Sequence, residues 1–139
     1  MTKEHKTVII GWLLKARQDY LTYQLICASG QALADTAAFH AQQAAEKWLK
    51  GLIVCNYITP PRFHNLLLLV GYLEPFYPEL LDDQWAKHCQ VLNEYAIEIR
   101  YYDPASPAKI IFPDLAETSM RLEAFRTFAK EKYGSLWVE

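Results

Sequence analysis

The sequence predicts an all-α protein, an up-and-down four-helix bundle with an additional short helix. Apolar residues recur at steps of three and four through the long segments, which is the period of an amphipathic helix. The breaks between these segments are short and contain Gly or Pro. No segment alternates clearly enough to be a strand, since the nearest one, KIIF, is too short. The 139 residues, 52% of them hydrophobic, fit a single domain spanning 1–139 with a packed core.

The first helix is predicted to run from Thr7 to Ser29. Gly30 is a suitable stop, and the short link after it offers Asp35 or Thr36 as a cap for the next helix. One stripe of this helix should be buried. Its members are Ile9, Leu13, Ala16, Tyr20, Tyr23 and Cys27.

The segment from Ala37 to Tyr57 is predicted to be a long central helix, because it lacks Pro and is rich in Ala, Leu, Lys, Gln and Glu. Its broad apolar face contains Ala41, Ala45, Trp48, Leu49, Leu52 and Asn56, and Gln42, Glu46 and Lys50 should point away from that face. A narrow flank between the two faces holds His40, Gln43, Ala44, Lys47 and Gly51. That flank combines groups that can meet an anion with two small residues that allow close approach, so it is the best site candidate.

A third, short helix follows the extended connection that Pro60–Pro61 enforces. It should begin near His64 or Asn65 and end at Pro75 and Pro78. Five successive apolar residues, LLLLV, make it apolar all round, which predicts burial on several sides.

The fourth helix is predicted from Asp82 to Tyr101. Its apolar stripe consists of Trp85, His88, Cys89, Leu92, Ala96 and Ile99. The proline-containing segment DPASPAKIIF then closes this helix and leads to the last one.

The fifth helix is predicted to start around Pro113, which suits the first helical position, with Asp114 and Glu117 near its positive end. Leu115, Leu122, Phe125 and Ala129 should face inward, and Gly134 should cap the C-terminal end. The remaining tail, SLWVE, is expected to be loose unless a partner holds Trp137.

The composition of the chain argues against several classes of function. A net charge of −2 and a pI near 6.1 give no global basic field, which argues against a sequence-blind nucleic-acid binder. Three widely spaced cysteines without a CxxC motif indicate neither zinc nor a disulfide framework, and they are expected to be buried free thiols in a reducing cytoplasm. The N-terminus MTKEHKTVII does not resemble a signal peptide, and the apolar run LLLLVGYL is too short to span a bilayer. We therefore expect a cytoplasmic protein that does not contact membranes.

The sequence lacks the motifs that are typical of several classes of enzyme. The sequence contains no Gly-rich phosphate loop, no HExxH and no GxSxG, and no cofactor is predicted. A metal site would need His40, His64 and His88 to converge with an acid. His88 lies on an apolar stripe and is predicted to be a hydrogen-bonded core histidine instead, so no metal site is predicted.

Eight residues are candidates for one ligand-binding groove. They are His40, Gln43, Lys47, Arg62, His64, Asn93, Arg100 and Tyr101. In an antiparallel bundle the cations among them can hold phosphate oxygens, the amides can read a base or ribose edge, and the aromatic ring can stack. A structural interpretation stays open: Arg100 would form a surface ion pair, His64 would donate to a backbone carbonyl, and Asn93 would tie two helices together.

Three strings, HAQQAAEKWLKGL, ITPPRFHNLLLL and LNEYAIEIRYYDP, occur in an order that resembles the HEPN family of small helical proteins from bacteria and archaea. The resemblance spans about Trp12 to Tyr133 and is to the branch often encoded beside small nucleotidyltransferases. It implies a HEPN-like helical bundle and a homodimer. It also implies a small nucleotidyltransferase as partner in a toxin–antitoxin-like pair.

One departure from the family pattern bears on catalysis. Ribonuclease members use an arginine followed four to six residues later by a histidine at the end of the fourth helix, and the matching residue here is Arg100. The residues after it are YYDPASP, without a histidine, so the general acid–base partner for RNA cleavage is missing. The sequence thus predicts a non-catalytic nucleotide- or phosphate-binding protein. Two alternatives stay open: an RNA-cleaving toxin that uses His40 or His64 with Arg100, and a dimerisation module in which Ala44 and Gly51 serve helix packing only.

Overall fold

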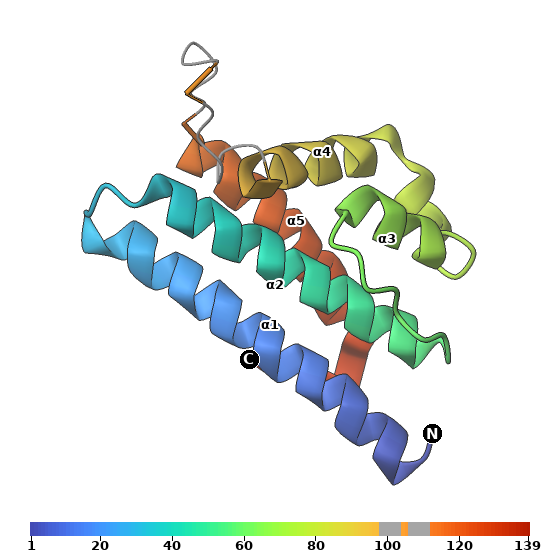
Figure 1. The fold of residues 1–139 in the computed structure, drawn as a ribbon. Coiled ribbons are helices and arrows are strands. Elements are labelled where there is room, and N and C mark those ends of the chain that lie inside the picture. Colours follow the sequence, from blue (N-terminus) through green and yellow to red (C-terminus); the bar gives the residue numbers. More distant parts are fainter. Residues whose placement is uncertain (98–103, 106–111) are drawn as a thin grey trace.

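The computed structural model describes residues 1–97, 104–105 and 112–139. These residues form five α-helices and two short 3-10 helices, with no strand among them (Figure 1). The α-helices are α1 (Lys3–Ser29), α2 (Ala34–Cys55), α3 (Leu66–Leu73), α4 (Asp83–Ile97) and α5 (Leu115–Tyr133), and the 3-10 helices are η1 (Pro78–Leu81) and η3 (Gly134–Leu136).

Helix α2 is the centre of the molecule, because it packs against α1, α3, α4 and α5. Figure 1 shows α1 running antiparallel along one side of α2, with α5 behind it and α3 and α4 on its other side. The predicted all-α fold is confirmed: the four long helices form the bundle, and α3 is the additional short helix.

Helix α1 begins earlier than predicted, at Lys3, because the Thr2 side chain accepts a hydrogen bond from the His5 amide at 3.1 Å and caps the helix. Gly30 ends it in the left-handed conformation, with φ of 71°, as predicted. The predicted burial of Cys27 is wrong. Its side chain is exposed, since it lines an open groove between the ends of α1 and α5.

Helix α2 begins at Ala34, so Asp35 and Thr36 lie in its first turn and neither is the cap. Gln42, Glu46 and Lys50, which were predicted to point away from the broad apolar face of this helix, are nevertheless buried. The three residues are only 1%, 3% and 5% exposed, respectively. The chain leading into α3 covers the face on which they lie, and Gln42 Nε2 donates to the His64 carbonyl oxygen at 2.8 Å.

Helix α3 is capped by Asn65, one of the two predicted starting residues, whose side chain accepts from the amides of Leu67 and Leu68. Burial of α3 on several sides was predicted wrongly. Leu67 and Leu68 are exposed, because α3 packs through one face only. That face consists of Leu66, Leu69, Val70 and Leu73.

The described part of α4 carries the predicted stripe, with Cys89, Leu92 and Ala96 buried. His88 is a core histidine as predicted, and its Nδ1 accepts from Arg121 Nη1 at 3.2 Å. Burial, assisted by the Arg121 charge, lowers the pKa of His88. The predicted continuation of α4 beyond residue 97, which includes Ile99, lies outside the described residues.

Helix α5 begins at Leu115 rather than at Pro113, because the Asp114 side chain accepts from the amides of Ala116 and Glu117. Gly134, with φ of 58°, ends the helix as predicted.

The tail after α5 is not loose, contrary to the prediction. Trp137 packs against Trp48 and Tyr133 with ring centroids 5.9 and 6.2 Å apart, so the domain itself holds the ring that was expected to need a partner.

Burial disfavours the thiolate form of two of the cysteines. All three cysteines are free, and burial raises the pKa of Cys55 to about 11 and that of Cys89 to about 12. None of the helices in the described part of the chain combines the length and the apolar composition that crossing a bilayer requires.

Candidate functional site

The first cluster of the candidate site lies between α1 and α2, around the carboxylate of Asp19. Asp19 is 8% exposed, because it follows Ala16 and precedes Tyr23 at the steps of three and four that face α2. His40 Nδ1 lies 2.8 Å from Asp19 Oδ1, and Lys47 Nζ donates to Asp19 Oδ2. Both residues of the predicted flank that were expected to bind an anion, His40 and Lys47, are therefore already paired with an internal carboxylate.

The second cluster surrounds the carboxylate of Glu46, which lies on α2 itself. His64 Nδ1 lies 2.9 Å from Glu46 Oε1, and Lys50 Nζ lies 3.3 Å from Glu46 Oε2. Gln43 Nε2 donates to Glu46 Oε1 at 3.4 Å. A buried carboxylate is costly unless it is paired, and these three partners supply the pairing.

Together the clusters form one polar strip on α2, because Gln43 is one helical turn from His40, Glu46 and Lys47. Two lysines and two carboxylates give the strip a formal charge of zero when both histidines are neutral, and +2 when both are protonated. The side chain of His64 is 68% exposed and that of Lys47 is 22% exposed, so ligands can reach the strip from solvent.

Each histidine of the strip is oriented by its carboxylate. An ionised carboxylate only accepts hydrogen bonds, so Nδ1 of His40 and of His64 carries the proton. In the neutral ring this leaves Nε2 as the acceptor and the basic atom. The arrangement can bind a hydrogen-bond donor or accept a proton at two places along α2.

The other predicted site residues are placed differently. Asn93 has a structural position: its Oδ1 accepts from the Leu66 amide at 3.0 Å, and its Nδ2 donates to Asn65 Oδ1 at 3.0 Å. Arg62 is exposed, two residues before His64. Arg100 and Tyr101 lie outside the described residues. The structure thus brings together His40, Gln43, Lys47 and His64, and it uses Asn93 to tie α4 to the start of α3.

The small residues of the flank serve packing. A Cβ at Gly51 would overlap the Tyr133 hydroxyl oxygen and would lie 3.0 Å from the Trp12 Cβ. Tyr133 Oη donates to the Trp48 carbonyl oxygen at 2.5 Å, which fixes α5 against α2 at this point. The space beside Gly51 is therefore filled by side chains of α1 and α5 and is not open to a ligand.

Sequence reasoning missed the two carboxylates that organise the strip. For Asp19 a signal was present, since Ala16, Asp19 and Tyr23 are in phase with the buried stripe of α1. Within the part of the chain that the structure describes, no group of three or more His, Cys, Asp or Glu side chains is arranged to hold a metal ion.

Comparison with known proteins places the chain in a family. The model of the HEPN domain matches residues 11–132, which is most of the sequence. The chain belongs to the HEPN family. No curated protein and no solved structure gave a significant match. Both carboxylate clusters of this HEPN domain lie within the matched residues.

Proposed function

We propose that this HEPN domain is a non-catalytic binding protein for a phosphate-bearing ligand of the nucleotide class, held along the polar strip of α2. The observation that carries the proposal is the convergence of Lys47 and His40 on a single buried carboxylate, Asp19. An ammonium group and an imidazole N–H that meet two oxygens of one anion are also a suitable pair of donors for two phosphate oxygens.

Further donors extend the strip. The exposed side chain of His64 lies at its outer edge, and Arg62 is exposed two residues earlier in the chain, so both can contact additional phosphate oxygens. The amide of Gln43, between the two clusters, can hydrogen-bond to a base or ribose edge. Because Asp19 and Glu46 already neutralise the lysines, a phosphate must compete with them, and we expect the affinity of the wild-type protein to be modest.

The test is a calorimetric titration of ATP into the wild type and three variants. Asp19→Asn removes the competing charge and should tighten binding. Lys47→Met should weaken it by a factor of about 10–100 or more, because a charge-assisted hydrogen bond contributes about 1.5–3 kcal/mol. Lys87→Met, at an exposed lysine of α4, is the matched control and should bind like wild type. Equal ATP binding by all four folded proteins would contradict the proposal.

The proposed partner is a small nucleotidyltransferase in a toxin–antitoxin-like pair, with the HEPN protein as a homodimer. The resemblance of the three sequence strings to that branch of the family supports this part. Co-expression with the adjacent reading frame, followed by affinity purification and light scattering, tests both associations. A monomer that leaves a neighbouring nucleotidyltransferase unbound would contradict them.

RNA cleavage is the second candidate, and one observation favours it. The Asp19–His40 and Glu46–His64 pairs each orient an imidazole through its Nδ1, as a general base is commonly oriented. Incubation of the pure protein with transfer RNA, in the presence and absence of a chelator, separates the candidates. Cleavage that disappears in both His64→Ala and Arg100→Ala would replace the binding function with an enzymatic one.

A further inference from the structure

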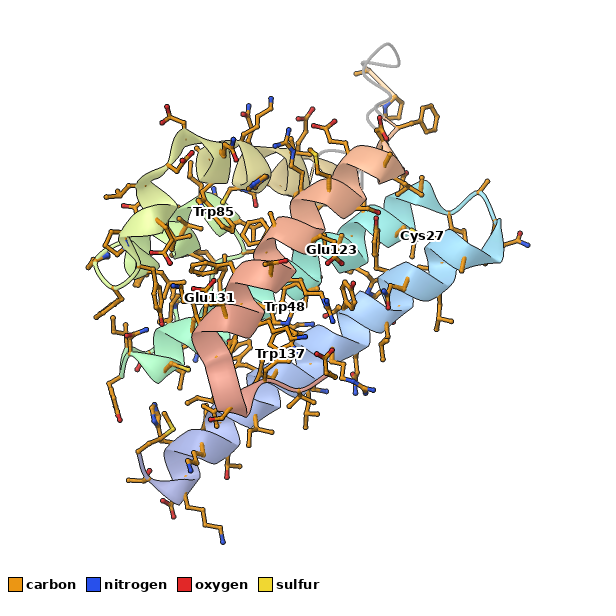
Figure 2. The ribbon with its side chains drawn as sticks, turned by 180° about the vertical axis from the view of Figure 1, so that it is seen from behind. Cys27, Trp48, Trp85, Glu123, Glu131 and Trp137 are labelled. Atoms are coloured by element: carbon orange, nitrogen blue, oxygen red, sulfur yellow. The ribbon has the colours of Figure 1, made fainter. Side chains whose placement is uncertain are left out.

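A partly enclosed cavity of about 220 Å³ lies between α1, α5 and the C-terminal residues. Figure 2 shows Trp48 and Trp137 between α5 and α1, on the side where the tail after α5 turns back toward α1. The lining includes Tyr20, Trp48 and Trp137, with Arg17, Arg126 and Glu139 at the edge. None of these residues belongs to the polar strip of α2.

The aromatic residues form a continuous wall. The ring centroids of Tyr20 and Trp48 are 5.7 Å apart, and those of Trp48 and Trp137 are 5.9 Å apart. The Arg126 guanidinium lies 5.0 Å from the Tyr20 ring and 5.9 Å from the Trp137 ring. A wall of rings beside a stacked guanidinium suits a flat ring that carries an anionic group.

The cationic edge of the cavity already holds an anion from the same chain. Arg126 Nη2 lies 3.0 Å from Glu139 Oε2, and Lys130 Nζ lies 2.5 Å from Glu139 Oε1. Arg17 Nε donates to the Glu139 carbonyl oxygen. The Lys130 hydrogen bond lowers the pKa of the Glu139 carboxyl, which therefore stays ionised at neutral pH.

We propose that this cavity is a binding site for a small single-ring ligand with one carboxylate or phosphate group. The ring lies against Tyr20 and Trp137, and the anionic group binds Arg126 in place of the Glu139 side chain. The ligand is small because the cavity is smaller than the roughly 300–1,000 Å³ typical of pockets for drug-sized molecules. The Glu139 carboxylate acts as an internal competitor that sets the affinity.

The test is a titration of benzoate and of phenyl phosphate, followed by tryptophan fluorescence, because Trp48 and Trp137 line the cavity. Wild type should bind at least one compound, and the tighter one identifies the anionic group. Glu139→Gln should bind it about tenfold more tightly, since the competing charge is removed. Glu131→Gln, at an exposed glutamate of α5 that Figure 2 labels, is the matched control and should bind like wild type.

Two further variants locate the site. Arg126→Met should abolish the fluorescence response, and Arg126→Lys, which keeps a positive charge, should retain part of it. Lys47→Met should bind like wild type, so this site stands or fails independently of the nucleotide site on α2. The proposal is overturned if neither compound binds, if Glu139→Gln and Glu131→Gln bind equally, or if Lys47→Met removes the response.

Discussion

At Gly51, α2 lies close to both α1 and α5. A Cβ there would overlap the Tyr133 hydroxyl and lie 3.0 Å from the Trp12 Cβ, and the hydroxyl is held in place by its hydrogen bond to the Trp48 carbonyl oxygen. Gly51→Ala should therefore lower the free energy of unfolding by about 1–3 kcal/mol, the usual cost of overpacking. Urea denaturation followed by circular dichroism measures this change.

Gly11→Ala is the matched control for this prediction. Gly11 lies inside α1, and an added Cβ would meet nothing within 4 Å. Alanine favours a helix interior over glycine by up to about 1 kcal/mol, so this variant should be at least as stable as wild type. If Gly51→Ala were equally stable, the close packing at α2 would be refuted.

His88 should make stability depend on pH. Its pKa is lowered in the folded protein, chiefly by burial and also by Arg121, while Asp82 acts in the opposite direction. The unfolded chain therefore takes up the proton first as the pH falls below about 6.5, the ordinary histidine value. The stability contributed by neutral His88 is complete above that pH and is lost as the pH falls toward the folded pKa.

The measurement is the free energy of unfolding between pH 7.5 and about 5, above the range in which most carboxylates titrate. His88→Gln keeps an acceptor for Arg121 but does not titrate, so its stability should fall less steeply than that of wild type. The other histidines are present in both proteins, and their contributions cancel. Parallel curves for the two proteins would contradict the prediction.

At this scale the sequence predicts apolar burial well and polar burial poorly. Helical periodicity identified Ile9, Leu92 and Phe125 as core residues because each lies on an apolar stripe that recurs at the helical period. Glu46 and Lys50 look like any solvated pair on a helix, and only the chain that folds over them decides that they are buried. Glu46 pairs with His64, 18 residues away, and with Lys50, one helical turn away. The sequence pattern of α2 alone therefore does not indicate whether Glu46 and Lys50 are buried.

Among the elements, the start of α3 depends on a pair of asparagines. Asn65 caps the helix, and Asn93 both donates to the Asn65 side chain and accepts from the first helical amide. Asn65→Ala should cost about 1 kcal/mol of stability through the lost cap. Asn65→Asp keeps the acceptor and should stay close to wild type in thermal unfolding. Equal losses in the two variants would show that the cap contributes nothing.

The number and order of the α-helices in the described residues were predictable, and their ends were less so. Long periodic runs separated by Gly and Pro leave few alternatives to a helical bundle. The ends depend on single side chains: Thr2 starts α1 four residues early, and Asp114 moves the start of α5 past Pro113. Leu67 and Leu68 were misjudged because an apolar run does not indicate which face of a short helix finds a partner.

For the molecule as a whole, the tail after α5 contacts both α1 and α5 and should stabilise their packing. Trp137 is half-buried against Trp48 and Tyr133. Trp137→Ala should cost about 2 kcal/mol, roughly half of the value for a fully buried tryptophan. Leu25→Ala, at an exposed position of α1, should change stability by less than about 0.5 kcal/mol. Equal urea midpoints for the two variants would mean that the tail contributes no stability.

The candidate site was predicted in part. The sequence placed His40, Gln43 and Lys47 on one flank, and the bundle brings His64 to the same strip, because the chain between α2 and α3 folds back over α2. The docked tail was not predictable, since its contacts join residues as far apart as Arg17 and Glu139. Such long-range contacts leave no mark in the local periodicity of either segment.

The enclosure of α2 by four other helices has a consequence for measurement. Amide protons near the middle of α2 can exchange with solvent only when its neighbours separate, which is the opening of the entire chain. Their slow exchange in deuterated buffer should therefore report the global unfolding free energy directly, without denaturant. Amides near Cys27, at the exposed end of α1, should exchange faster, because local opening there requires less free energy than global unfolding.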